Sequence, residues 1–463
     1  MKRLLTIIAT LALSTNVWGQ APIVPIDAYG AGPGVPTPAV SADGGLAPIV
    51  DQSASGALSA AEPSGLPYGP TPMPGGSAYS SCGCVGRCQG ECQGDGVVGC
   101  LTGCRQCPPN CACPLCLPQR MWFSGNYVQT FTKSRSLPPL VTTSPDGTAR
   151  ALAGRLPGAT ILYGAGSSGN STEPGMQLDF GRWLGDGHVG FGGRLFYMQR
   201  EGDGFSLASN GTSPIIGLPY IDLGAVNDAI LLSHPEVGTN GSVDISNDLE
   251  TISGEALFRF KIADSCGIRF SLLGGYHYIR VDDNVLLRAQ TTDIDNTNLI
   301  TNGTVIDITD AFNAENQFHG GSFGLSLRLR QNRTVVHGMA KMSIGNMHQQ
   351  LNIAGQQTFT DPNPAIAPVT INNGLYAQAS MIGQQARDKT TFIPEASLQL
   401  GHRLSDRVDV NIGYMVLYMT NVAQAGDSIN QVVDIFGAGG PAAQMKDGSL
   451  WIQGITAGIG YNW

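Results

Sequence analysis

The chain has few charged residues and few long apolar stretches. Charged residues make up 13% of its 463 residues, about half of the usual ~25%. Beyond the N-terminal segment, no uninterrupted apolar stretch approaches the ~20 residues that a membrane-spanning helix needs. Basic residues number only 26 and the net charge is -9, whereas binding to nucleic acid depends on many Lys and Arg side chains. A nucleic-acid partner and a helical anchor are therefore not expected.

The N-terminus has the pattern of an export signal. Lys2 and Arg3 precede an apolar run over residues 4–13, and Gly19 supplies a small residue at the expected cleavage point. This order of features predicts a secretory signal peptide over residues 1–19. No cysteine directly follows it, so a lipid anchor is not expected. Export without a helical anchor leaves the periplasm, secretion or the outer membrane as destinations.

Two further segments differ in composition from the rest of the chain. Residues 20–81 are dense in Pro, Gly, Ala and Ser, which predicts a disordered tether. Residues 82–118 hold ten of the eleven cysteines, and in an exported chain such density favours disulfides. Metal binding is the weaker alternative because the spacing is irregular, and disulfides to like subunits or to a cell-wall layer are a third. The disulfide candidates are Cys82, Cys84, Cys88, Cys92, Cys100, Cys104, Cys107, Cys111, Cys113 and Cys116.

The remaining cysteine, Cys266, stands far from this cluster. It lies in a segment that we expect to be a short turn between two strands. It offers a link between the N-terminal segment and the rest of the chain, but a plain buried or free thiol is the favoured interpretation. The pairing of cysteines cannot be deduced from sequence alone.

The last strand carries the strongest signal of fold. One face is apolar and the other is small or polar, which is typical of a wall between lipid and a wet lumen. The chain then ends on Tyr461-Asn462-Trp463, which resembles the terminal signature that outer-membrane barrels present to their insertion machinery. Outer-membrane lipid and that machinery are the expected partners. The edge strand of a soluble sandwich is the alternative. The apolar face consists of Ile455, Ala457, Ile459, Tyr461 and Trp463.

Residues 119–463 show the same alternation in a series of hairpins. Short turns join the strands of each hairpin, and longer connections separate the hairpins. This arrangement, together with 62 glycines, predicts an all-β fold: a closed antiparallel transmembrane β-barrel of ten to twelve strands. The connections expected to be loops are residues 133–174, 200–249, 282–317, 347–390 and 421–448.

Charged and amide side chains on the polar faces of these strands are expected to face the lumen. Barrels of ten to twelve strands are narrow, since open aqueous channels are found at ~16 to 18 strands. Such mixed charges could therefore line a pore or fill it as a salt-bridge network. The lumen-lining candidates are Arg194, Glu255, Arg259, Lys261, Arg269, Arg328, Lys341, Asp409 and Asn411.

The chain also resembles a known family, the bacterial outer-membrane proteins called beta-barrel porin family seven. The resemblance covers about residues 119–463 and implies an outer-membrane barrel, while a role in transport is implied only by the family name. The segments that carry it are, in order, residues 122–123 (WF), 137–145 (LPPLVTTSP), 159–164 (ATILYG), 180–184 (FGRWL), 316–321 (NQFHGG), 343–349 (SIGNMHQ) and 416–418 (VLY).

These observations favour a monomeric or trimeric outer-membrane barrel that passes small solutes passively. The alternative is a non-conducting structural or adhesive envelope protein that makes its contacts through long surface loops and the cysteine-rich segment. Neither an enzymatic activity nor a cofactor or metal is expected. A hydrolase would need a Ser and a His on adjacent strands at the same depth, which the sequence alone does not establish.

Overall fold

The computed structural model describes residues 121–132, 135–168, 172–185, 187–265, 267–295, 300–435 and 440–463. These residues belong to one of two compact units, Ser77–Trp463. The predicted signal peptide, tether and disulfide-linked segment lie outside the described residues, and so does Cys266.

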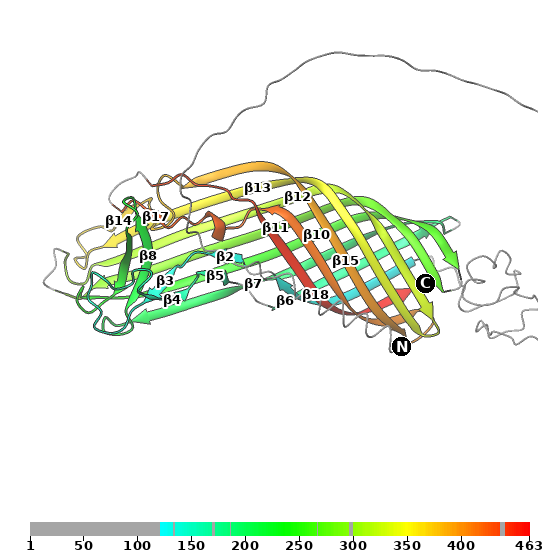
Figure 1. The fold of residues 1–463 in the computed structure, drawn as a ribbon, viewed down its shortest axis with the longest axis horizontal. Coiled ribbons are helices and arrows are strands. Elements are labelled where there is room, and N and C mark those ends of the chain that lie inside the picture. The colour runs from blue at the N-terminus through cyan, green and yellow to red at the C-terminus, as the bar shows by residue number, and fades with distance from the viewer. Residues whose placement is uncertain are drawn as a thin grey trace, which may run out of the picture. The chain divides into compact units, whose positions relative to one another are not determined.

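Ten long antiparallel strands form the wall of the molecule (Figure 1). Each pairs with two neighbours, in the order β12, β11, β10, β7, β6, β1, β18, β16, β15 and β13, and pairing between β13 and β12 completes the ring. The predicted all-β barrel is confirmed, with a strand number at the lower end of the expected range. The ten strands are β1 (Met121–Thr132), β6 (Thr172–Leu184), β7 (Val189–Ser209), β10 (Thr239–Ser265), β11 (Ile268–Asp293), β12 (Val305–Gln331), β13 (Thr334–Thr360), β15 (Gly383–Arg403), β16 (Val408–Val422) and β18 (Gly448–Asn462).

Four of the wall strands are much longer than a membrane requires. Strands β10 to β13 contain 26 or 27 residues each, whereas a transmembrane strand needs about 9–11. They extend away from the end where the C-terminus lies, toward the short strands β3, β4, β8, β14 and β17 (Figure 1). The wall therefore continues well beyond the part that lipid can cover.

The two halves of these long strands have opposite polarity. Near the short turns, the outward side chains of β12 are apolar and exposed, as at Phe323 and Leu327, while Arg328 faces inward. Toward the other end, the inward positions are the apolar ones, such as Phe312, which is buried, and the outward positions are polar, such as Glu315. Since strand side chains alternate, this inversion separates a lipid-facing half from a half that is built like a water-soluble barrel.

This inversion explains why three of the expected loops are wrong in part. Strand β10 already begins at Thr239, and β11 continues to Asp293, so residues 239–249 and 282–293 belong to strands. Similarly, β12 starts at Val305 and β13 ends at Thr360. A search for outward apolar and inward polar residues misses strands in which the two faces are exchanged.

The inverted half and the connections around it form a folded head, which consists of the described residues within 135–168, 210–250, 280–317, 347–388 and 421–447. None of the helices in the described part of the chain is long and apolar enough to cross a membrane. The smaller elements of the head are β2 (Arg135–Leu137), β3 (Val141–Thr143), β4 (Thr160–Tyr163), β5 (Gly166–Ser168), β8 (Ile216–Asp222), β9 (Asn227–Ser233), β14 (Val369–Ile371), β17 (Val432–Val433) and the 3-10 helix η1 (Gly426–Ser428).

Candidate functional site

The candidate site is the inside of the barrel, where several layers of side chains follow one another. A polar cavity of about 120 Å³ lies toward the short-turn end. A layer of buried charged groups comes next, then a cluster of buried apolar side chains that includes Phe318 and Met415, and finally the apolar core of the head. What matters for function is whether these layers leave a path along the axis.

The charged layer joins opposite sides of the ring. Arg194 on β7 and Glu395 on β15 lie five strands apart in either direction, and Arg194 Nη1 donates to Glu395 Oε1 at 2.6 Å. Both side chains are almost fully buried, with 6% and 5% of their surface exposed. An arginine and a glutamate that meet across a ring from opposite strands occupy its full width, so the lumen is bridged at this level.

Neighbouring charges complete the layer. Lys341 Nζ lies 2.7 Å from Glu395 Oε2 and also bonds Glu255, which reaches across from β10. Arg194 Nε lies 3.5 Å from Asp179 Oδ2. These charges are also opposite one another on adjacent strands, since Asp179 and Glu255 both pair with Arg194 and Lys341 pairs with Glu395. Opposite charges facing each other across strands stabilise a sheet, and here they fill the lumen as well.

Two Ser-His pairs lie inside the barrel. His277 on β11 is fully buried, with its Nε2 atom 2.9 Å from the Ser253 hydroxyl and its Nδ1 atom 2.7 Å from the Ser343 hydroxyl. His337 on β13 lies 3.0 Å from the Ser326 hydroxyl, and this second pair lines the polar cavity. The sequence could not place a Ser and a His on adjacent strands at one depth, and the structure does so twice.

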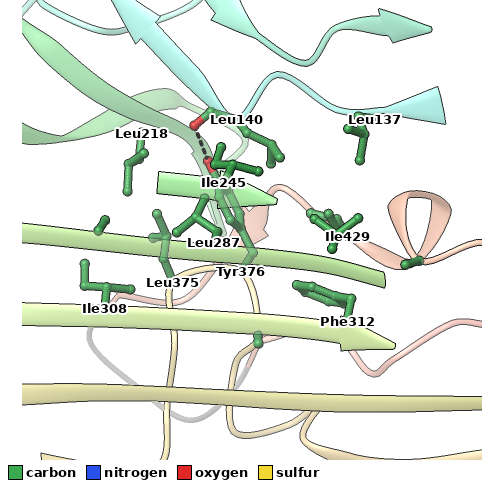
Figure 2. Close-up of a cluster of buried hydrophobic side chains, with 14 of the residues drawn as sticks. Leu137, Leu140, Leu218, Ile245, Leu287, Ile308, Phe312, Leu375, Tyr376 and Ile429 are labelled. Carbon is green, nitrogen blue, oxygen red and sulfur yellow. Dashed lines mark hydrogen bonds between the residues drawn. The ribbon is translucent and has the colours of Figure 1, made fainter. Parts of the chain in front are cut away.

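The head at the other end of the barrel has an apolar core, part of which is shown in Figure 2. Inward side chains of the long strands, such as Ile245 and Phe312, pack against residues of the loops that lie between them. Tyr376, from the loop before β15, is 1% exposed and donates its hydroxyl to the carbonyl of Pro219 at 2.8 Å. Each apolar side chain buried in this way contributes about 1.5–3 kcal/mol, so the loops are held inside the ring by a dry core.

A buried carboxylate fastens the Tyr376 loop to the wall. Asp310 on β12 accepts the backbone N–H groups of Tyr376 and Ala377 at 3.1 and 3.0 Å. Burial in the apolar core raises the pKa of Asp310 to about 6, although these N–H donors oppose that rise. A methyl group at Gly374 would collide with the same carboxylate, which shows how closely the loop approaches it.

This raised pKa predicts that the loop is held more firmly in acid. Because the pKa in the folded head lies above the ordinary value of 3.8, the folded state binds the proton more tightly than an opened state. Stability is therefore highest below pH about 4 and falls as the pH rises through about 6, by about 3 kcal/mol. Hydrogen exchange of the Tyr376 and Ala377 amides, corrected for intrinsic rates, should show more protection at pH 4 than at pH 7.5. Asp310→Asn should abolish this difference. Equal protection at both pH values in the unmodified protein would contradict the role of Asp310 in holding the loop.

A second buried pair ties the first loop to the wall. Arg135 on β2 forms an ion pair with Asp283 on β11, and the two side chains are 6% and 2% exposed. Arg135 also donates to the backbone carbonyls of Asn247 and Asp248 at 3.0 and 3.1 Å. The other oxygen of Asp283 accepts the N–H of Ala425 at 3.2 Å. One ion pair therefore fixes two different loops to the inside of the ring.

The sequence-derived candidates for the lumen fall into three groups. Arg194, Glu255 and Lys341 belong to the charged layer. On the cavity side of this layer, Arg259 Nη2 donates to Asp179 Oδ1 at 2.9 Å and to Oδ2 at 2.6 Å. Lys261 instead lies at the rim, 3.0 Å from Asp264 and above the ring of Trp183. The candidates that line the cavity at the short-turn end together with Arg194 and Arg259 are Arg269, Arg328, Asp409 and Asn411.

Several residues of the interior are absent from the sequence-derived candidates. Asp179 and Glu395 lie at the alternate positions of their strands whose side chains face inward, as the polar side chains around them do. Strict alternation would therefore have identified them. His277 lies on the same inward parity of β11 as Arg269. Arg135 and Asp283 gave no such signal, because one lies in a connection and the other in a region where the polarity is inverted.

Together, the ring of antiparallel strands and its outward apolar half define the chain as an outer-membrane β-barrel. A family model described as "Putative beta barrel porin-7 (BBP7)" matches residues 122–463. The chain belongs to this family, which confirms the resemblance found in the sequence. The chain matches none of the curated proteins.

Solved structures of other barrels are similar to this chain at low identity. The outer membrane protease OmpT from Escherichia coli is 9% identical, with a TM-score of 0.37, and the match covers 75% of this chain and 97% of that one. A Pseudomonas aeruginosa FadL homologue is 10% identical, with a TM-score of 0.22 and coverage of 76% and 92%. The P. putida toluene transporter TodX is 10% identical, with a TM-score of 0.19 and coverage of 76% and 91%. Nothing about function follows from likenesses of this size.

Proposed function

We propose that this barrel is a closed anchor that holds a folded head at the outer surface of the membrane, and that its role in the envelope is structural or adhesive. The observation that carries the proposal is the bond between Arg194 and Glu395, which joins opposite strands across the lumen. The apolar core of the head supports it from the other end. Short turns of outer-membrane barrels face the periplasm and long connections face outward, so the head belongs on the outside.

Passage of a dissolved molecule would require both barriers to move. The buried ion pair of Arg194 and Glu395 joins opposite strands of the ring, and two clusters of buried apolar side chains follow it, one around Phe318 and one in the head. We therefore expect vesicles that contain the purified mature protein to resist swelling in small sugars, as empty vesicles do. A variant lacking residues 374–381, the loop segment around Tyr376 in the apolar core of the head, is the comparison. Swelling at porin-like rates by the unmodified protein would contradict the closed-anchor proposal.

Passive passage of small solutes is the second candidate. The polar cavity between the short-turn end and the charged layer favours it, because this part of the lumen is lined by charged and amide groups. On this alternative, the cavity is a vestibule and the head opens to complete the path. Rapid swelling of vesicles with the unmodified protein would support it.

We also propose that the two Ser-His pairs are structural. Both ring nitrogen atoms of His277 form hydrogen bonds with serine hydroxyls, and the three side chains belong to residues that are 0–6% exposed. No substrate therefore reaches this site. His337 and Ser326 do line the cavity, and they provide the test. A fluorophosphonate probe should leave Ser326 unmodified in the folded protein, and stoichiometric labelling that disappears in His337→Ala would overturn the proposal.

The partners expected from the sequence stay predictions. Tyr461 and Trp463 lie at the end of β18 with 37% and 45% of their surfaces exposed and their rings 5.0 Å apart. This placement suits contact with lipid at the membrane interface, and recognition by the insertion machinery is proposed for the same residues. Links to like subunits or to the cell wall would rest on the cysteines of residues 82–118, outside the described part of the chain.

A further inference from the structure

Two arginines face the polar cavity from adjacent strands. Arg269 on β11 and Arg328 on β12 are direct cross-strand partners, and both line the cavity. On the next strand, His337 is the direct partner of Arg328 and also lines it. Like charges directly opposite one another destabilise a sheet. The two arginines therefore concentrate positive charge in a chain whose net charge is -9.

The carboxylates near these two arginines offset their charge only in part. The nearest oxygen of Asp409 lies 4.0 Å from Arg328 Nη2, beyond a hydrogen bond, and accepts the Asn462 amide at 3.1 Å instead. Asp264 accepts a long hydrogen bond of 3.4 Å from Arg269 Nε, but it also pairs with Lys261 at 3.0 Å and 41% of its side chain is exposed to solvent.

The other acid of the cavity is already occupied. Asp179 accepts two bonds from Arg259 and a third from Trp122 Nε1 at 2.6 Å. The buried Nε atom of Arg259 has no hydrogen-bond partner within the described protein. Two amide oxygens of the cavity lining, those of Asn126 and Asn411, also have no partner within the described protein. The charge of the lining is nevertheless unbalanced, because four arginines, Arg194, Arg259, Arg269 and Arg328, face two aspartates, Asp179 and Asp409.

We propose that this cavity binds a small oxyanion, held mainly by Arg269 and Arg328. Guanidinium groups match the planar oxygen pairs of carboxylates and the oxygens of phosphates by paired hydrogen bonds. An anion between the two arginines would remove their mutual repulsion. The volume of about 120 Å³ is smaller than the ~300–1,000 Å³ of sites for drug-sized molecules, so the ligand is an ion of a few heavy atoms. A free carboxylate and a free phosphate share this chemistry.

The test is a calorimetric titration of the full mature protein in detergent with inorganic phosphate and, separately, with acetate, both against a chloride background. Saturable binding of at least one anion is expected. Arg328→Gln should weaken it at least tenfold. Arg280→Gln is the matched control, because Arg280 lies in the head and its side chain is 42% exposed. Tighter binding of phosphate would identify a phosphate site, and tighter binding of acetate a carboxylate site.

Thermal unfolding gives a second readout that a purely structural arginine would not move. Phosphate or acetate should raise the Tm of the unmodified protein and not that of Arg328→Gln, whereas sodium chloride at the same ionic strength should raise neither. If Arg328→Gln fails to fold, saturable binding to the unmodified protein that Arg269→Gln weakens would still support the site. The absence of saturable binding of either anion, or equal affinity in Arg328→Gln, would overturn the proposal.

Discussion

Replacing Arg135 with alanine is expected to free two loops of the head from the barrel wall. The substitution leaves the Asp283 carboxylate buried without its cation, with only the N–H of Ala425 as a partner. Removing one member of a buried ion pair costs about 3–5 kcal/mol, because the remaining charge stays in a poorly solvating environment. The loss falls on the docking of the loops, since the strands of the wall keep their own hydrogen bonds.

Hydrogen exchange of the Leu140 and Ala425 amides measures this effect directly. A loss of 3–5 kcal/mol corresponds to opening that is roughly 10² to 5 × 10³ times more frequent. Arg155→Ala is the matched control, since Arg155 and Asp228 form an ion pair at 2.9 Å in the same head with both side chains 35% exposed. That variant should lose less than about 1 kcal/mol. Equal exchange in Arg135→Ala and Arg155→Ala would show that the buried pair does not hold the loops.

Replacing Lys341 with methionine is expected to destabilise the whole barrel. Methionine keeps most of the volume but removes the ammonium group that lies between Glu255 and Glu395. Two carboxylates then face each other with Arg194 as the main remaining cation. We expect a loss of about 3–5 kcal/mol in the free energy of unfolding, measured in lipid vesicles by urea titration and tryptophan fluorescence.

Two comparisons isolate the cause of that loss. Lys389→Met is the matched control, because Lys389 lies 3.4 Å from Asp447 with 40% of its side chain exposed, and it should change stability by less than about 1 kcal/mol. Adding Glu255→Gln to Lys341→Met should restore part of the stability, because it removes one unpaired charge. Glu255→Gln could instead lower the free energy of unfolding of Lys341→Met further, by as much as the loss of another buried polar group costs. In that case the ion network is not the source of the effect.

The lipid-facing half of the fold could be predicted from the sequence for a simple physical reason. There, lipid on one side and polar groups on the other force a two-residue alternation, and strands such as Ser322 to Arg330 show it with little interruption. The tight turn near Asn332 follows from the same pattern, with a positive φ of 55° at that residue. The head could not be predicted in this way, because its strands exchange the apolar and polar faces.

The candidate site was predictable in composition but not in arrangement. Alternation identifies Arg194, Glu255 and Lys341 as inward residues, because it fixes the face of a strand. It does not say that Arg194 meets a glutamate 201 residues later in the chain, since that contact depends on the closure of the ring. The apolar core of the head could not be predicted for the same reason, because Tyr376 contacts Pro219 and Leu140 across 157 and 236 residues.

Ion current through the purified mature protein in a planar lipid bilayer tests the closed barrel most directly. Arg194 and Glu395 join opposite strands across the lumen, and the head has a buried apolar core around Tyr376, so we expect no unitary conductance steps above the background of the bilayer. The same preparation with residues 374–381 deleted serves for comparison. Reproducible, long-lived conductance steps from the unmodified protein would contradict the account.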